Sequence, residues 1–232
     1  MLPLPSVGEG WGEGDFFEEI AGRSFMPHDD GVFAINDTLK TIRDRRSVRT
    51  FTKDDVTDGE LEILLSAANA APSAHNQQAW RFIILKGGKK QELAQLVAAQ
   101  AAGYPRPAQA LLRMAGKTIT SSPVVIAVVN TGDLVRRGTE LFKVDKDTAH
   151  DFFRTMEIQS SAAAVENILL AATSLGLGTV WLGALYLIKD EVLRFLGEPA
   201  GEFMAVVPVG RPAKAGGGPK KQPLEMKVRT LA

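Results

Sequence analysis

Three runs of apolar residues stand out along the chain. They are WRFIIL at 80–85, VVIAVV at 124–129 and FMAVVPV at 203–209. Each has the length of a strand and is rich in β-branched residues, and none alternates with polar positions as a half-exposed hairpin strand would. The runs therefore predict strands of one buried sheet.

Between these runs the pattern changes to that of helices. The sequence TDGE at 57–60 has capping-box spacing before LEILLSAANAA, a helix that should end near Pro72 because proline disfavours helical geometry in the preceding residue. Residues 72–78 are then a loop. KKQELAQLVAAQAAG at 89–103 predicts an amphipathic helix ended by Gly103.

A longer helix is predicted over 154–175, ending before Gly176. Its residues are apolar or small nearly all round, so we expect it to be wholly buried. The small residues at 160–164, SSAAA, allow close backbone approach. They favour either a central core helix or a subunit interface.

The first 35 residues lack a steady apolar period and are rich in glycine and acidic residues. We interpret 1–35 as an N-terminal extension and 36–232 as a single domain with a C-terminal arm. Asn36 or Asp37 can cap a short helix carrying Leu39 and Ile42, and the first arginines follow at its carboxyl end.

Composition excludes several classes of protein. The 232 residues carry 27 basic and 27 acidic side chains, which argues against a dedicated nucleic-acid binder. Without cysteine there is no disulfide framework or thiolate site, and three separated histidines make a metal site unexpected. With no membrane-length apolar run and no secretion signal, we expect a cytoplasmic location.

Two segments carry candidate binding chemistry. RDRRSVRTF at 43–51 places four arginines within seven positions, and converging guanidinium groups with a serine hydroxyl suit a phosphate monoester. The alternative is a solvated helix end. Three amide side chains, those of Asn76, Gln77 and Gln78, lie just ahead of a buried strand, where unpaired amides would be costly. They could hydrogen-bond a ligand ring with several polar edge atoms. The alternative is that they cap the loop.

Two glycine-rich segments do not match nucleotide-binding motifs. GLGTVWLGAL at 176–185 ends a helix rather than opening one, and Trp181 interrupts the G-x-G-x-x-G spacing of a Rossmann fold. GGGPKKQ at 216–222 lacks the Lys-Ser/Thr ending of a P-loop. The segment 104–117 has a composition that a lid over substrate could have.

Together, four segments resemble the FMN-dependent nitroreductase family. They are RRSVRTF at 45–51, APSAHNQQAW at 71–80, LGLGTVWLGAL at 175–185 and VPVGRP at 207–212 with a basic tail. The resemblance spans about residues 37–226. It implies an α+β fold with a central, mostly antiparallel sheet flanked by helices, in an entwined homodimer with FMN at the subunit interface.

Carried over by position, the resemblance also implies the site. Arg45, Arg46 and Ser47 would hold the FMN phosphate and ribityl chain. Arg49 would contact the flavin ring as a basic side chain. The ring would also be contacted by the loop residues Pro72, Ser73, Ala74, Asn76 and Gln78, and by the backbone of Trp181, Leu182 and Gly183 near its N5 atom. Lys221 of the tail would be a further phosphate ligand. Pro72, Ser73 and Ala74 would line the cofactor of the other subunit.

The chain departs from the family pattern in three places. Ala79 replaces a frequent proline, Lys221 stands where arginine is usual, and the N-terminal extension is added. No general acid is assigned, because a lone loop histidine such as His75 is more often structural or solvated. Glu157 and Glu166 on the long helix are expected to be ion-paired or surface groups.

Two functions from different classes follow from the resemblance. One is an oxidoreductase that transfers hydride from NADH or NADPH through FMN to a nitroaromatic, quinone or similar small-molecule acceptor by a ping-pong mechanism. The other is a flavin-binding or flavin-handling protein without dedicated reductase activity. Reductive dehalogenation and flavin-destroying oxygen chemistry, both known among relatives, are further possible activities.

Overall fold

The computed structural model describes residues 36–141, 145–214, 218 and 221–231. The chain divides into two compact units, one that ends at Arg43 and one that begins at Asp44. The predicted extension over 1–35 lies outside the described residues. Helix α3 (Asp37–Asp44) begins as predicted, with the Leu39 N–H donating to Asn36 Oδ1 at 3.0 Å. The remaining description concerns the second unit.

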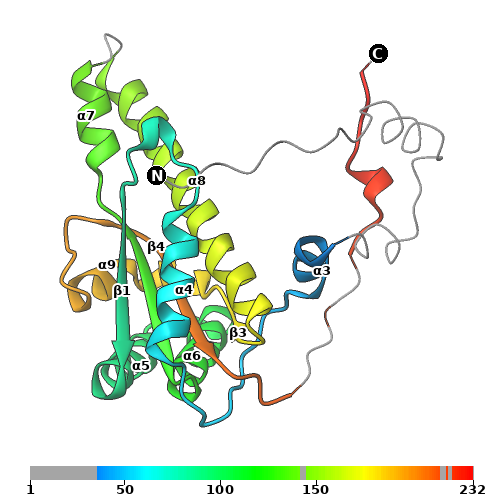
Figure 1. Ribbon diagram of the computed structural model, residues 1–232. Helices are drawn as coiled ribbons and strands as arrows, with labels where there is room; N and C mark the ends of the chain where they lie inside the picture. Colours follow the sequence, from blue (N-terminus) through cyan, green and yellow to red (C-terminus); the bar gives the residue numbers. More distant parts are fainter. Residues whose placement is uncertain (1–35, 142–144, 215–217, 219–220, 232) are drawn as a thin grey trace, which may run out of the picture. The chain divides into compact units, whose positions relative to one another are not determined.

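A central sheet organises the second unit (Figure 1). Within the described residues it has four strands in the order β1-β2-β4-β3, namely β1 (Trp80–Lys86), β2 (Val124–Asn130), β4 (Glu202–Gly210) and β3 (Gly178–Thr179). Each neighbouring pair is antiparallel. The predicted α+β fold with an antiparallel sheet is confirmed, and each of the three predicted strands extends by a residue at one or both ends.

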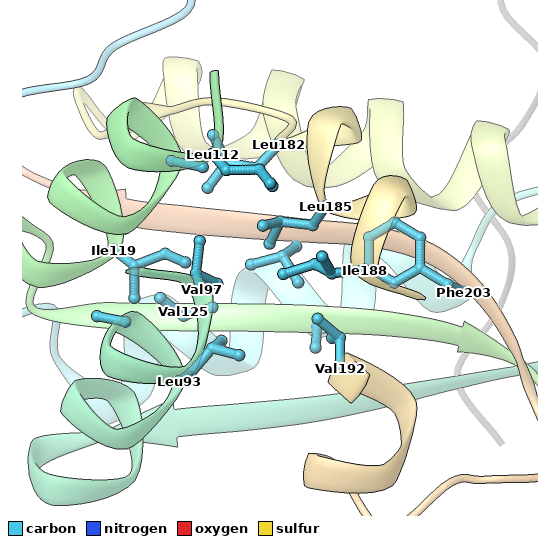
Figure 2. Packing of buried hydrophobic residues seen from close by; sticks show 14 of the residues in the cluster. Leu93, Val97, Leu112, Ile119, Val125, Leu182, Leu185, Ile188, Val192 and Phe203 are labelled. Atoms are coloured by element: carbon cyan, nitrogen blue, oxygen red, sulfur yellow. The ribbon is translucent and has the colours of Figure 1, made fainter. Parts of the chain in front are cut away.

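Helices cover both faces of the sheet. On one side lie α5 (Gly87–Ala101), α6 (Arg106–Ser121), the 3₁₀ helix η2 (Gly183–Ile188) and α9 (Lys189–Phe195). Figure 2 shows Leu93, Val97 and Ile119 of this layer around Val125 of β2. On the other side lie α4 (Asp58–Asn69) and α8 (Lys146–Ser174). Because strand side chains alternate, Val125 and Ile126 belong to opposite cores.

Local signals explain where α4 begins and where α8 ends. The Thr57 side chain accepts from the Glu60 N–H while the Glu60 side chain accepts from the Thr57 N–H, so the predicted capping box is present. At the end of α8 the Leu177 N–H donates to Ala172 O at 2.8 Å and Gly176 adopts φ +71. This is a Schellman end, where glycine has the least steric cost.

Helix α8 differs from the prediction in its start and its burial. It begins eight residues before the predicted position 154, after Asp145, which accepts from the Thr148 N–H at 2.8 Å. It is not wholly buried in one chain, because Phe152 is 43% exposed and Glu166 is exposed. Composition alone could not distinguish a helix buried on all sides from one that leaves small residues such as Ala162 half-buried.

Three smaller elements complete the unit. They are α7 (Asp133–Leu141) and the 3₁₀ turns η1 (Ala74–Asn76) and η3 (Leu224–Met226). The segment 104–117, which could have been a lid, lies largely in α6, and Leu112 and Ala115 are in the core. Among the described residues no helix is both long and apolar enough to cross a bilayer.

Candidate functional site

The basic segment is held between two neighbouring segments of backbone. On one side Ser47 pairs with Thr179 of β3, and the Val48 N–H donates to Thr179 O at 2.8 Å. On the other side the Thr52 N–H donates to Arg211 O at 2.9 Å. These contacts join residues 47–52 to both β3 and the end of β4, so the backbone that carries the arginines has a defined position.

The side chains of this segment point in different directions. Val48 is half-buried and Phe51 is buried, whereas Ser47 and Arg49 are exposed. Arg45 is half-buried, and its Nε lies 3.7 Å from Glu166 Oε1 on α8. Apolar groups therefore anchor the segment, while Ser47 and Arg49 are open to solvent.

The tail approaches the same arginines. A Cβ placed on Gly218 would lie 2.7 Å from Arg46 Nε, which shows how closely the backbone passes that guanidinium. Lys221, three residues later, is exposed. The tail and the basic segment therefore lie side by side at residues 46 and 218.

The segment Trp181–Gly183 follows directly after the strand that pairs with the basic segment. The Leu182 N–H donates to Val206 O at 2.9 Å, which fixes this backbone to β4. Leu182, Leu185 and Ile188 are buried at the three-residue spacing of a 3₁₀ helix, and Gly183 is exposed. Because Trp181 is two residues from Thr179, the structure brings the basic segment and Trp181–Gly183 together.

The loop over residues 73–78, called here the amide loop, has an unusual backbone. His75, Asn76 and Gln78 are the non-glycine residues with positive φ in the described part of the chain, at 53°, 52° and 49°. Such conformations are sterically costly for side chains with a Cβ and persist where surrounding contacts impose them. Strain of this kind is concentrated at functional sites.

The amide side chains of this loop bond one another and a neighbouring helix. Gln78 Nε2 donates to Asn76 Oδ1 at 3.0 Å, and Arg137 of α7 donates to Gln77 Oε1 at 3.3 Å. Asn76, Gln78 and His75 are exposed. The sequence argument that unpaired amides here would be costly therefore does not hold, because the loop is solvent-accessible and its amides are partly paired.

The amide loop and the basic segment contact different sides of α8. The Ala74 N–H donates to Ser160 Oγ at 3.1 Å, whereas Arg45 approaches Glu166. Six residues of α-helix correspond to about 9 Å along the axis and to faces about 120° apart. The predicted site residues thus form two groups in one chain, one around Thr179 and one around Ser160.

Glu157 is a site-adjacent residue whose role the sequence did not reveal. It is 2% exposed, and its Oε1 accepts from the Leu134 N–H at 2.7 Å and from the Val135 N–H at 3.4 Å at the start of α7. Burial raises the pKa of this carboxyl, and the two N–H groups oppose that rise. The sequence-based expectation of an ion-paired or surface group was wrong for Glu157 and is confirmed for Glu166.

Ser160 and Arg137 were also missed as neighbours of the site. Ser160 lies in the small-residue run that the sequence assigned to helix packing, and Arg137 lies in α7, which is not among the helices predicted from the sequence. In the described residues no group of three or more His, Asp or Glu side chains could hold a metal ion.

Comparison with known proteins gives a consistent result. The family model described as the nitroreductase family matches residues 42–211. An NADPH-flavin oxidoreductase of Vibrio harveyi is 30% identical over 168 residues, covering 71% of this chain and 61% of that protein. An FMN reductase [NAD(P)H] of Bacillus subtilis is 27% identical over 192 residues, covering 77% of this chain and 67% of that protein.

Solved structures agree with these sequence matches. A nitroreductase-type protein of Desulfovibrio desulfuricans, solved in complex with FMN, is 28% identical, covers 85% of this chain and 98% of its own, and superposes with a TM-score of 0.65. A BluB-like flavoprotein of Clostridium difficile is 26% identical, with coverage of 85% and 100% and a TM-score of 0.65.

Proposed function

Because the chain belongs to the nitroreductase family, we propose that it transfers hydride from NADH or NADPH through FMN to a nitroaromatic, quinone or similar acceptor. The observation that carries the proposal is the pairing of Ser47 with Thr179, which places the arginine segment beside Trp181–Gly183. The arginines and the segment that ends at the exposed Gly183 are thus neighbours, an arrangement that would suit a flavin mononucleotide.

The basic segment fits the phosphate end of the cofactor. Arg45, Arg46 and Ser47 would bind the phosphate and ribityl chain, because guanidinium and hydroxyl donors form charge-assisted bonds with phosphate oxygens. Lys221 would add a positive charge from the tail. The close approach of Gly218 to Arg46 supports this assignment, since it keeps the tail near the arginines.

The other residues fit the ring. Arg49 would lie near the pyrimidine end, where a positive charge favours the reduced ring. Trp181, Leu182 and Gly183 would lie beside N5, with the N–H of Gly183, an exposed residue, as the donor. The amide loop would meet a ring edge through Asn76 and Gln78, with Pro72, Ser73 and Ala74 lining it.

The separation of the two groups on α8 favours a site shared between two chains. Each chain would offer its basic segment to one cofactor and its amide loop to the other. The exposed Phe152 and the half-buried Ala162 give α8 accessible surface that such a contact could use.

FMN would supply the redox chemistry, accepting hydride at N5 and passing electrons on to the acceptor. The protein would bind and orient this cofactor through the groups named above. The sequence contains no Rossmann fingerprint, so the nicotinamide nucleotide has no recognisable domain of its own and would approach the open face of the ring. The acceptor must stack on that same face.

The direct test is the purified protein itself. We expect a yellow preparation that releases FMN, and oxidation of NADH or NADPH that accelerates when a nitroaromatic or quinone is added. A colourless protein that takes up no added FMN would refute the proposal. Flavin uptake without any acceptor-dependent oxidation would instead favour a flavin-handling role.

Initial-rate kinetics test the shared face. We expect parallel double-reciprocal lines, because the oxidised nucleotide must leave before the acceptor enters. Intersecting lines, together with a complex that holds both molecules, would contradict a single binding face.

A second candidate reaction is the flavin-destroying oxygen chemistry that the family resemblance also left open, and one match favours it. A 5,6-dimethylbenzimidazole synthase of Rhodospirillum rubrum is 28% identical over 175 residues, covering 72% of this chain and 78% of that protein. The same assay tests this alternative when it is run in air with NADH or NADPH. Loss of the flavin absorbance without reduction of the acceptor would identify flavin-destroying chemistry.

A further inference from the structure

One turn of α8 contacts both the amide loop and the start of α7, the helix whose Arg137 bonds Gln77 in that loop. Glu157 and Ser160 are three residues apart and so lie on neighbouring positions of the same helix face. Ser160 Oγ accepts from the Ala74 N–H in the loop, and Glu157 Oε1 accepts from the first N–H groups of α7. Both border the same narrow gap, too small for a water molecule, together with Ser73, Gln77, Gln78 and Leu134.

The Ser160 contact spans a large separation in sequence and has a defined direction. Its hydroxyl donates to Met156 O at 2.6 Å, which orients the oxygen so that a lone pair is available to the Ala74 N–H. Ala74 is the first residue of η1, directly before His75 and Asn76 with their positive φ. The hydrogen bond therefore fixes the loop at the point where its strained part begins.

The rest of the loop is held by bonds among its own residues and by one bond from α7. The Gln77 N–H donates to Ala74 O at 3.0 Å, and the Gln78 N–H donates to Ser73 Oγ at 3.1 Å. Helix α7, whose start is capped by Glu157, contributes Arg137 to Gln77. Bonds inside the loop hold its shape, whereas Ser160 and Glu157 hold its position.

We propose that Ser160 is a positioning residue for flavin binding: it touches no cofactor atom but sets the amide loop against the flavin ring, with Glu157 supporting the same loop through α7. This inference rests on the proposed function for the identity of the ligand. Its physical basis is that a strained loop keeps a binding conformation only while its surroundings impose it.

The neighbouring serine provides a matched control. Ser161 is buried on the same helix, and its Oγ donates to Glu157 O at 2.9 Å and to Ile158 O at 3.2 Å, both within α8. Ser161→Ala removes a hydroxyl from the same helix without touching the loop. Ser160→Thr keeps a hydroxyl at the anchor position.

The experiment measures binding of FMN and riboflavin to the flavin-free protein by fluorescence quenching. We expect Ser160→Ala to weaken both ligands about threefold to tenfold, which corresponds to the loss of one hydrogen bond. The ratio of the two affinities should stay constant because the loop faces the ring and not the phosphate. Ser160→Thr should restore most of the affinity, and Ser161→Ala should bind as the unmodified protein does.

A second readout needs no flavin. Amide hydrogen exchange of residues 73–78 should speed up in Ser160→Ala and stay unchanged in Ser161→Ala. If the alanine variant does not fold, Ser160→Cys carries the test, since a thiol fills the space but accepts hydrogen bonds weakly.

Several results would overturn the inference. These are unchanged affinity and exchange in Ser160→Ala, a loss confined to FMN, or an equal effect of Ser161→Ala. Failure of the unmodified protein to bind either flavin would refute the proposed function instead. The exchange experiment would still decide whether Ser160 positions the loop.

Discussion

At the scale of single residues, the arginines differ in how far the folded chain fixes them. Arg45 is half-buried against Glu166, and Arg46 donates to Arg45 O at 2.8 Å. Arg49 is exposed, with a 3.5 Å contact to Ser47 O. We therefore expect Arg45 to be the best-positioned phosphate ligand and Arg49 to be the most mobile side chain of the group.

Substitution of Arg45 tests the phosphate assignment. Arg45→Ala should weaken FMN by roughly 1.5–3 kcal/mol, because a charge-assisted hydrogen bond is lost, and should leave riboflavin nearly unaffected. Titration of both ligands into the flavin-free protein measures the difference. Arg49→Ala is the contrast, since a ring contact should affect both ligands alike. Equal weakening of the two ligands by Arg45→Ala would indicate general disruption.

The buried carboxyl of Glu157 gives a pH-dependent prediction. Burial raises its pKa above the ordinary value of 4.5, so the folded state binds more protons than the unfolded chain between these two values. The stability that this group contributes is present below pH 4.5 and is lost as pH rises through the raised pKa. We therefore expect the unmodified protein to lose stability relative to Glu157→Gln as pH rises toward neutrality.

Paired thermal unfolding curves of the two proteins across this pH range measure the effect. The glutamine variant keeps an acceptor for the α7 N–H groups, so the comparison isolates the charge. A stability difference that does not change with pH, or that changes in the opposite direction, would contradict the assignment.

At the scale of elements, β3 and the basic segment approach each other unusually closely. A Cβ placed on Gly178 would lie 2.8 Å from Val48 Cβ, which is shorter than side chains tolerate. The backbone bonds at Thr179 require this approach, since they join the two segments directly. The position of the arginines therefore depends on a glycine more than 120 residues away in the chain.

A single methyl group tests this dependence. Gly178→Ala should destabilise the protein by about 1–3 kcal/mol and weaken FMN binding, because the segment must shift away from β3. Denaturant unfolding and flavin titration measure the two effects. The double variant Gly178→Ala/Val48→Ala should recover much of both, since the valine methyl groups are removed. Additive losses in the double variant would show that steric contact with Val48 is not the cause.

At the scale of the whole molecule, α8 has two kinds of surface. One side packs on the sheet through Val165, Ile168 and Ala172, and elsewhere on the helix Phe152 is exposed and Ala162 is half-buried. The two groups of site residues lie on different sides of this same helix. A second copy of the chain would cover the open side and complete both sites.

Assembly is therefore predicted to accompany cofactor binding. Light scattering should give twice the chain mass of 25.0 kDa, and flavin should raise the thermal stability of the dimer, because a ligand shared by two chains binds only the assembled state. A flavin-loaded, active monomer would refute this prediction.

Much of the fold could be predicted because its signals are local. The apolar runs predicted three strands to within about a residue at each end, the TDGE sequence located the start of α4, and Gly176 located the end of α8. The arginine and amide segments were recognised by their order along the chain. Periodicity, caps and motif order can be read within a few residues, so no tertiary contact is needed.

Only the tertiary structure decided how these segments meet. Ser160 bonds Ala74 across 86 positions, and Glu157 caps a helix 23 positions before it. Neither residue carries a local signal, because a serine and a glutamate suit many places in a helix. Their contacts arise from packing of the sheet and helices, which brings distant backbone N–H groups against α8. The sequence therefore predicted which groups could bind a ligand, whereas long-range packing decided where those groups lie.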